Sequence, residues 1–118
     1  MATIEDLMRA TLFDVFNERD PARRREAIAR TYHPEVRFSD PEEVVVGRDA
    51  LDAKAQGILD KAPGFVFSHA GPAHVSDDLG YQAWNFGPEG QPPVVRGTDI
   101  ALVRDGVIVN LYTLLLTD

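Results

Sequence analysis

Residues 96–113, RGTDIALVRDGVIVNLYT, contain two apolar runs joined by Asp105 and Gly106. An Asp-Gly pair is preferred in the two-residue turn of a β-hairpin, because both residues tolerate the positive φ angles of that turn. The stretch therefore predicts two long antiparallel strands. Asp99 lies in the middle of the first strand, where a carboxylate is rarely found unless it faces water or serves a site.

The turn also predicts which side chains share a face of the hairpin. Counting outward from it pairs Ala101 with Asn110 and Asp99 with Tyr112, so that Asp99, Asn110 and Tyr112 lie on one mixed face. The opposite, aliphatic face would carry Thr98, Ile100, Leu102, Val107, Val109, Leu111 and Thr113. In one interpretation the aliphatic face forms the core and the mixed face meets water. In the other, helices enclose a pocket over the mixed face and a second subunit covers the aliphatic face.

The rest of the chain predicts helices first and long strands last. Apolar residues recur at helical spacing after a capping box formed by Thr3 and Asp6, and again after Asp20 and Pro21. The predicted helices span residues 4–19, 22–32 and 49–62, two short strands lie within 35–41 and 42–47, and longer strands span 65–75, 80–86, 94–104 and 107–116. This order predicts one α+β domain over residues 1–118, with helices on one face of a curved sheet.

Composition excludes several classes of function. The net charge of -7 argues against a nucleic-acid partner, which needs clustered Lys and Arg. The absence of cysteine removes disulfides, thiolate zinc sites and cysteine nucleophiles, and His69 and His74 have opposite strand parity, which disfavours a shared metal site. The N-terminal residues lack the pattern of a signal peptide, and no apolar run reaches membrane-spanning length. We therefore expect a cytoplasmic protein without a metal, a cofactor or a membrane partner.

An ordered set of short motifs carries a family resemblance. Two helical segments are followed by Tyr-His-Pro at 32–34, VRFSDP at 36–41, VVVGRDAL at 44–51 and GTDIALVRDGVIVNLY at 97–112. This order resembles the SnoaL-like branch of the nuclear transport factor 2-like superfamily. The resemblance implies a cone-shaped α+β fold, in which three helices and a curved, mixed but mainly antiparallel sheet enclose an apolar pocket, often in a homodimer joined through the sheet. The family includes ketosteroid isomerases, polyketide cyclases and dehydratases, so it does not fix the reaction.

The ketosteroid isomerase pattern within this family implies roles for individual residues. It places the proton-shuttling carboxylate at Asp40, a protonated carboxyl donor at Asp99 and a supporting tyrosine at Tyr32. Two carboxylates in one apolar cavity are useful because desolvation and mutual repulsion separate their pKa values, leaving one base and one acid. The chain departs from the pattern in its first helix, where Leu12 and Phe16 stand and no tyrosine is found. Half of the expected oxyanion hole is therefore missing, which argues against a true ketosteroid isomerase.

Most of the candidate residues also have a structural interpretation. Asp40 precedes a proline and is suited to capping a turn, and Tyr32 is suited to the core. His69 is either a pocket acid or a partly buried strand residue, and Tyr112 would join Asp99 as a hydrogen-bond donor. Candidates for the wall of a ligand pocket are Tyr32, Trp84, Phe16, Phe67 and Asn110.

Two functions remain open from the sequence. The first is acid/base isomerase, cyclase or dehydratase chemistry on a small hydrophobic carbonyl compound, without a cofactor. The second is a non-catalytic module that uses the same cavity to bind a ligand, or its sheet to form a dimer.

Overall fold

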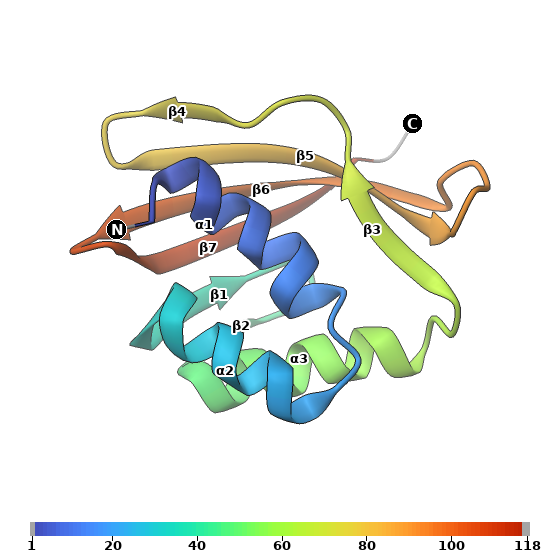
Figure 1. The fold of residues 1–118 in the computed structure, drawn as a ribbon, viewed down its shortest axis with the longest axis horizontal. Helices are drawn as coiled ribbons and strands as arrows, with labels where there is room; N and C mark the ends of the chain where they lie inside the picture. The colour runs from blue at the N-terminus through green and yellow to red at the C-terminus, as the bar shows by residue number, and fades with distance from the viewer. Residues whose placement is uncertain (1, 117–118) are drawn as a thin grey trace.

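Seven strands form one curved sheet that the helices cover from one side (Figure 1). The computed structural model describes residues 2–116. The elements in chain order are α1 (Ile4–Ala10), the π-helical turn η1 (Thr11–Phe16), α2 (Pro21–Thr31), β1 (Tyr32–Ser39), β2 (Val44–Val46), α3 (Arg48–Asp60), β3 (Phe65–His69), β4 (His74–Ser76), β5 (Leu79–Pro88), β6 (Val95–Arg104) and β7 (Val107–Leu116). The predicted α+β architecture is confirmed.

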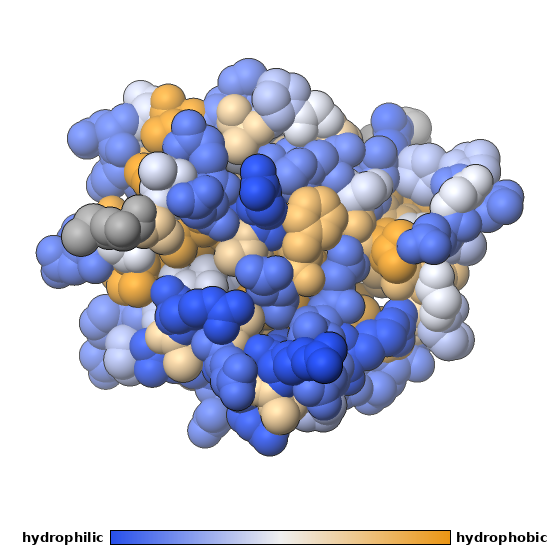
Figure 2. Space-filling view, in the orientation of Figure 1, coloured by the Kyte–Doolittle hydropathy of each residue, from blue (hydrophilic) through white to orange (hydrophobic). Residues whose placement is uncertain are grey.

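The sheet has the strand order β2-β1-β7-β6-β5-β3. Strand β4 also pairs with β5, along a different segment of that strand from the one that pairs with β3. All pairings are antiparallel except that of β1 with β7, which is parallel. Helix α1 lies over β5 and β6, whereas α2 and α3 pack against β1 (Figure 1). The face that carries the helices is mostly hydrophilic on its outside (Figure 2), because the helices turn their apolar residues inward onto the sheet.

Local capping explains where the helices begin. The capping box of Thr3 and Asp6 starts α1, and the carboxylate of Asp20 accepts the amide of Arg23 at the start of α2. Gly47, with a φ of +100°, turns the chain from β2 into α3. None of the helices within residues 2–116 is long and apolar enough to cross a membrane.

The predicted helix over residues 4–19 is confirmed as far as Phe16, but its second half is π-helical rather than α-helical. The chain widens at Thr11 into the π-helical turn η1, which closes with a 2.9 Å hydrogen bond from the Asn17 amide to the Leu12 carbonyl. The side chain of Asn17 then pairs with the backbone of Phe67 on β3, donating to its carbonyl at 2.9 Å and accepting from its amide at 2.6 Å. The π-turn thus ties the end of the first helix to the sheet and directs Leu12 and Phe16 toward the interior.

The predicted strand over residues 65–75 is interrupted. Residues 71–73 leave the sheet between β3 and β4, with Gly71 at a φ of +96°. The buried Gln82 of β5 covers the gap, because its amide nitrogen donates to the Gly71 carbonyl at 3.0 Å. The Gly-Pro pair at 71–72, a strong turn signal, is the local cause of the break.

The hairpin turn is confirmed, but the predicted register is wrong. Asp105 and Gly106 have φ angles of +54° and +81°, as a two-residue turn requires. The register then shifts at Val109, so Leu102 rather than Ala101 faces Asn110. The extra residue is a β-bulge, and it reverses the side of the sheet to which every later residue of β7 points.

The shift has two consequences for the candidate residues. Asp99 lies opposite Thr113, and the two side chains share the helix-covered face. Asn110 and Tyr112 lie on the other face with Ile100, where the Asn110 amide is 3.3 Å from the Tyr112 hydroxyl. The mixed face expected for Asp99, Asn110 and Tyr112 therefore does not exist.

Candidate functional site

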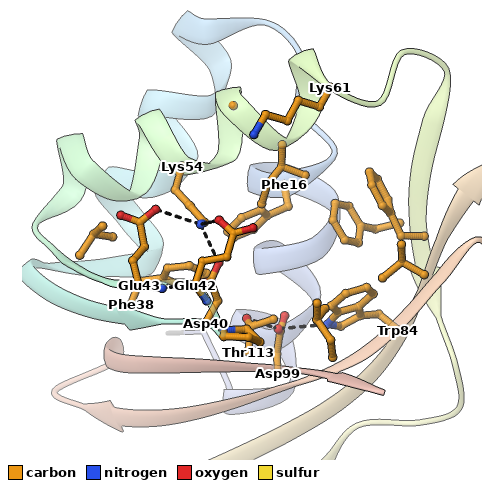
Figure 3. A pocket seen from close by; sticks show the side chains of 18 of the residues that line it. Phe16, Phe38, Asp40, Glu42, Glu43, Lys54, Lys61, Trp84, Asp99 and Thr113 are labelled. Atoms are coloured by element: carbon orange, nitrogen blue, oxygen red, sulfur yellow. Dashed lines mark hydrogen bonds and ion pairs between the residues drawn. The ribbon is translucent and has the colours of Figure 1, made fainter. Parts of the chain in front are cut away.

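A cavity of about 580 Å³ lies between α3, η1 and the helix-covered face of the sheet (Figure 3). Its lining comprises Leu12, Phe16, Phe38, Asp40, Pro41, Glu42, Glu43, Val45, Ala50, Ala53, Lys54, Gly57, Ile58, Lys61, Phe67, Trp84, Phe86, Val95, Asp99, Thr113 and Leu115. A volume of this size suits a small organic ligand.

Small residues on one helix and rings on the other elements create this space. Helix α3 turns Ala50, Ala53 and Gly57 toward the cavity, and a Cβ added at Gly57 would have no atom within 4 Å. Aromatic rings from η1, β1, β3 and β5 form the largest apolar part of the remaining wall. Among these rings, Phe67 is stacked on Phe86 with ring centres 4.0 Å apart. The rings pack against one another and form an apolar surface. The polar groups that also line the cavity are therefore the candidates for its chemistry.

Asp99 is a buried carboxyl group on the floor of the cavity (Figure 3). The indole nitrogen of Trp84 donates to its Oδ1 at 3.1 Å, and the Thr113 hydroxyl donates to the same oxygen at 2.8 Å. Burial raises the pKa of Asp99 to about 6, although the hydrogen bonds from Thr113 and Trp84 act in the opposite direction. Within the described residues both hydrogen bonds go to Oδ1, which leaves Oδ2 as the oxygen that can meet a ligand.

A glycine makes the contact between Trp84 and Asp99 possible. Trp84 lies opposite Gly97 in the β5–β6 pairing. A Cβ on Gly97 would come within 2.3 Å of the indole ring, so only glycine lets the indole lie across β6 and reach Asp99, two residues further along.

Asp40 lines the same cavity but is held very differently. Its Oδ1 accepts the amides of Glu42 and Glu43 at 2.9 and 3.0 Å, so the turn-capping interpretation is confirmed. Its Oδ2 is 2.8 Å from the ammonium group of Lys54 on α3. Burial favours a higher pKa for Asp40, but the hydrogen bonds from Lys54, Glu43 and Glu42 outweigh it and hold the pKa below its usual range.

Lys54 is the centre of an ion cluster at the edge of the cavity. Its ammonium group also lies 3.2 Å from a carboxylate oxygen of Glu42 and 3.2 Å from one of Glu43. Burial favours a lower pKa, but the hydrogen bonds to Asp40, Glu43 and Glu42 outweigh it and raise the pKa of Lys54. The lysine is therefore a fixed positive charge in the cavity wall.

The structure brings some of the predicted residues together and separates others. Phe16, Asp40, Phe67, Trp84 and Asp99 all line the cavity. Four other predicted residues, namely Tyr32, His69, Asn110 and Tyr112, are not part of its lining.

Each of these four has another structural position. Tyr32 is fully buried and donates its hydroxyl to Thr11 at 3.0 Å. Its burial raises the pKa of the hydroxyl. His69 lies at the end of β3 against the ring of Phe13, where burial and then the charge of Arg9 lower its pKa. Asn110 and Tyr112 are on the other face of the sheet because of the bulge at Val109.

Among the described residues no cluster of three or more acidic or histidine side chains could hold a metal ion.

Sequence reasoning missed Lys54 and Thr113. Lys54 occurs among Leu51, Ala55 and Ile58, that is, on the apolar side of its helix, and a lysine in such a position is a usable signal. Thr113 could be found only with the correct register of the last hairpin.

The sequence and the fold both match known proteins. Residues 10–111 match the family model of the SnoaL-like domain. The structure is similar to that of a candidate isomerase of the SnoaL-like family from Agrobacterium tumefaciens, with a TM-score of 0.86 and 26% identity over 94% of this chain and 95% of that one. No curated protein sequence matches the chain.

Two further solved structures share the fold at lower identity. A candidate ketosteroid isomerase from Kribbella flavida has a TM-score of 0.73 and 19% identity, over 97% of this chain and 78% of its own. A candidate polyketide cyclase from Sinorhizobium meliloti has a TM-score of 0.72 and 20% identity, over 92% of this chain and 93% of its own. At these identities the likeness concerns the fold alone.

Proposed function

The chain belongs to the SnoaL-like family, and from that premise we propose that its cavity binds a small hydrophobic carbonyl compound on which Asp99 moves a proton. The observation that carries the proposal is the buried Asp99 carboxyl group, which lines the cavity and accepts both of its side-chain hydrogen bonds, from Trp84 and Thr113, through Oδ1. The aromatic wall supplies apolar contact for the carbon skeleton of the ligand.

The pKa of Asp99 supports its role as the base. A base works best when its pKa is close to the operating pH, and a carboxyl group with a pKa of about 6 is mostly ionised at neutral pH while remaining a far stronger base than an ordinary aspartate. Asp40, to which the family resemblance assigned this role, is a weaker base because Lys54 and two amides stabilise its ionised form. We therefore place the proton transfer at Asp99 Oδ2.

The proposed reaction begins with removal of a proton from the carbon next to the carbonyl group. The C–H electron pair moves into the new carbon–carbon double bond, and the carbonyl π electrons move onto the oxygen, giving an enolate and a protonated Asp99. Return of the proton to a different carbon isomerises the compound. Alternatively, the enolate carbon attacks a second carbonyl group of the same molecule, and the resulting alkoxide takes the proton from Asp99. Both sequences regenerate the carboxylate.

Exchange of hydrogen for deuterium tests this proposal without knowledge of the natural substrate. Cyclic ketones and enones of graded size, such as 2-cyclohexenone and the tetralones, are incubated with the protein in deuterated buffer and followed by NMR. We expect exchange next to the carbonyl that depends on the wild-type protein and is lost in Asp99→Asn, where the amide can still accept from Trp84 and Thr113 but cannot take a proton. Quenching of the fluorescence of Trp84, the sole tryptophan, reports binding separately.

Two outcomes of this experiment are informative against the proposal. Exchange that is equal in the wild type and in Asp99→Asn removes Asp99 from the chemistry. Binding without exchange across the whole panel favours a non-catalytic ligand-binding protein.

We also propose that a second copy of the chain covers the outer face of the sheet. This face presents Ile100, Leu102, Tyr112, Leu114 and Leu116, of which Leu114 and Leu116 are 52% and 48% exposed. An exposed apolar patch on a sheet is typical of an interface between subunits. Sedimentation at micromolar concentration should give a dimer that Leu114→Glu dissociates, and a monomeric wild-type protein would contradict this assembly.

A further inference from the structure

We propose that Lys54 is a catalytic residue that binds the substrate oxygen on which negative charge develops. The inference rests on the proposed function, because it supplies what proton removal by Asp99 needs. An enolate oxygen in an apolar cavity requires a preorganised donor, and such donors are among the largest contributions to catalysis. The helix residues that face the cavity from η1, Leu12 and Phe16, offer none.

The position of Lys54 suits this task. Among residues 2–116, the cationic side chains that line the cavity are those of Lys54 and Lys61. Lys61 is exposed and follows the last residue of α3, whereas the side chain of Lys54 is only 11% exposed. Lys54 projects from α3 and Asp99 from β6, so the two groups approach the same space from opposite walls (Figure 3). A charge in such a partly desolvated wall acts on a bound oxygen more strongly than one at the surface.

The present partners of Lys54 differ in how easily they can be replaced. Asp40 is a permanent partner, because its carboxylate is 10% exposed and is fixed by two backbone amides. Glu42 and Glu43 are 77% and 51% exposed and each lies 3.2 Å from the ammonium group. Exposed ion pairs of this kind contribute little free energy. A negative oxygen that enters the cavity can therefore take the place of either glutamate.

The donor count of the lysine fits this exchange. An ammonium group has three N–H donors, and the three carboxylates of Asp40, Glu42 and Glu43 occupy them now. Asp40 would keep one donor and hold the side chain in place. The ligand would take a donor that a glutamate releases.

A phenol probe tests this role separately from proton transfer. In the enolate state Asp99 is protonated, so Asp99→Asn reproduces its lack of charge and serves as the background for every variant. The probe is 4-nitrophenol, because its ionised oxygen resembles an enolate oxygen and its ionised form is coloured. Its ionisation is followed by absorbance against pH in the bound and free states, and its binding is followed by Trp84 fluorescence.

Lys54 should lower the pKa of the bound phenol by about one unit relative to the free phenol, as expected for an opposite charge within a few ångströms. The Lys54→Met/Asp40→Asn pair, which removes the ammonium group without leaving its buried carboxylate partner unpaired, should abolish this shift. Asp40→Asn alone should retain it. Glu42→Gln/Glu43→Gln should bind the phenolate several-fold more tightly, because the competitors for the ammonium group lose their charge. Glu26→Gln/Glu89→Gln, which removes two exposed negative charges outside the cavity, is the control for the change in net charge of the glutamate variant.

Four results would overturn the assignment: a shift that survives loss of Lys54, a shift that disappears in Lys61→Met instead, unchanged phenolate binding in the glutamate variants, or failure of the phenol to bind. The first and third results would mean that Lys54 has only a structural role, namely an ion pair that connects α3 to the turn after β1. Because these measurements use Asp99→Asn, they are independent of the deuterium exchange by the wild-type protein. Failure of oxygen binding by Lys54 is therefore distinguishable from failure of proton transfer by Asp99.

Discussion

Asp40 and Asp99 are the same chemical group in the same cavity, yet their pKa values move in opposite directions. Both are largely withdrawn from solvent. Asp40 has a lysine and two backbone amides around it, all of which favour the carboxylate, whereas Asp99 has two neutral donors on one oxygen. The difference shows that burial alone does not set the charge of a carboxyl group. The charge and the number of the neighbouring donors decide which aspartate is a turn cap and which can exchange a proton.

Replacing each aspartate by asparagine should separate the two roles most sharply. Asp99→Asn removes the proposed base and should lower the rate of deuterium exchange by about 100-fold or more, the usual contribution of a general base. Asp40→Asn keeps an acceptor for the amides of Glu42 and Glu43 and should lower the rate by a much smaller factor. NMR exchange rates on the same ketone measure both. A larger loss in Asp40→Asn would restore Asp40 as the base and contradict the comparison.

Removing the partner of Asp40 should reduce stability. Lys54→Met leaves a mostly buried carboxylate without its cation and should lower the free energy of unfolding by about 3 kcal/mol, the lower end for breaking a buried ion pair. The Lys54→Met/Asp40→Asn pair should recover part of this loss, because the unpaired charge is gone. Urea denaturation measures each value. An unchanged midpoint in Lys54→Met would show that the ion cluster contributes nothing to the fold.

The two aspartates should also give opposite dependences of stability on pH. For Asp99 the folded pKa of about 6 is raised above its ordinary value of 3.8, so the folded state binds the proton more tightly. Its contribution is complete below about pH 4 and is lost as the pH rises through 6, a change on the order of 2–3 kcal/mol. For Asp40 the folded pKa is lowered, so its contribution is present above the ordinary pKa and is lost as the pH falls through the folded value.

Unfolding curves from pH 3 to 8 on the wild type, Asp99→Asn and Asp40→Asn isolate these terms by difference. The wild type should lose stability relative to Asp99→Asn between about pH 4 and 6, and relative to Asp40→Asn only at the acidic end. Parallel curves for the wild type and Asp99→Asn would mean that Asp99 has an ordinary pKa.

Two glycines offer a smaller and equally direct contrast. Gly97→Ala would push a methyl group against the indole of Trp84 and should cost about 1–3 kcal/mol, with a change in tryptophan fluorescence as the contact with Asp99 is disturbed. Gly57→Ala places a methyl group in open space on a helix and should stabilise the protein by about 0.5–1 kcal/mol. Thermal unfolding measures both. Equal effects at the two positions would show that Trp84 does not depend on the space above Gly97.

The sequence predicted local features better than long-range register. The turn at Asp105 and Gly106, the capping box of Thr3 and the turn cap of Asp40 depend on neighbouring residues, and each is confirmed. The bulge at Val109 is different. Residues 107–116 are apolar on both faces, so their pattern does not indicate which face is buried, and one extra residue exchanges Tyr112 for Thr113 beside Asp99.

The candidate site was predicted only in part for the same reason. Asp99 was recognised because a charge in an apolar strand is unusual on its own. The partner that distinguishes Asp40 comes from Lys54 on another element, and the partner that holds Asp99 comes from Trp84, opposite Gly97 on the neighbouring strand. Such pairs are fixed by the packing of α3 on the sheet and by strand register. The spacing of residues along the chain indicates neither of these.

The titration of the two carboxyl groups tests the central contrast most directly. Protein labelled with ¹³C at the aspartate carboxyl carbon is followed by NMR from pH 2 to 8, with the two resonances assigned through Asp99→Asn and Asp40→Asn. We expect Asp99 to titrate near pH 6 and Asp40 to stay ionised to below the ordinary pKa of an aspartate, 3.8. An Asp99 resonance that titrates together with the exposed aspartates would contradict its role as the base of the cavity.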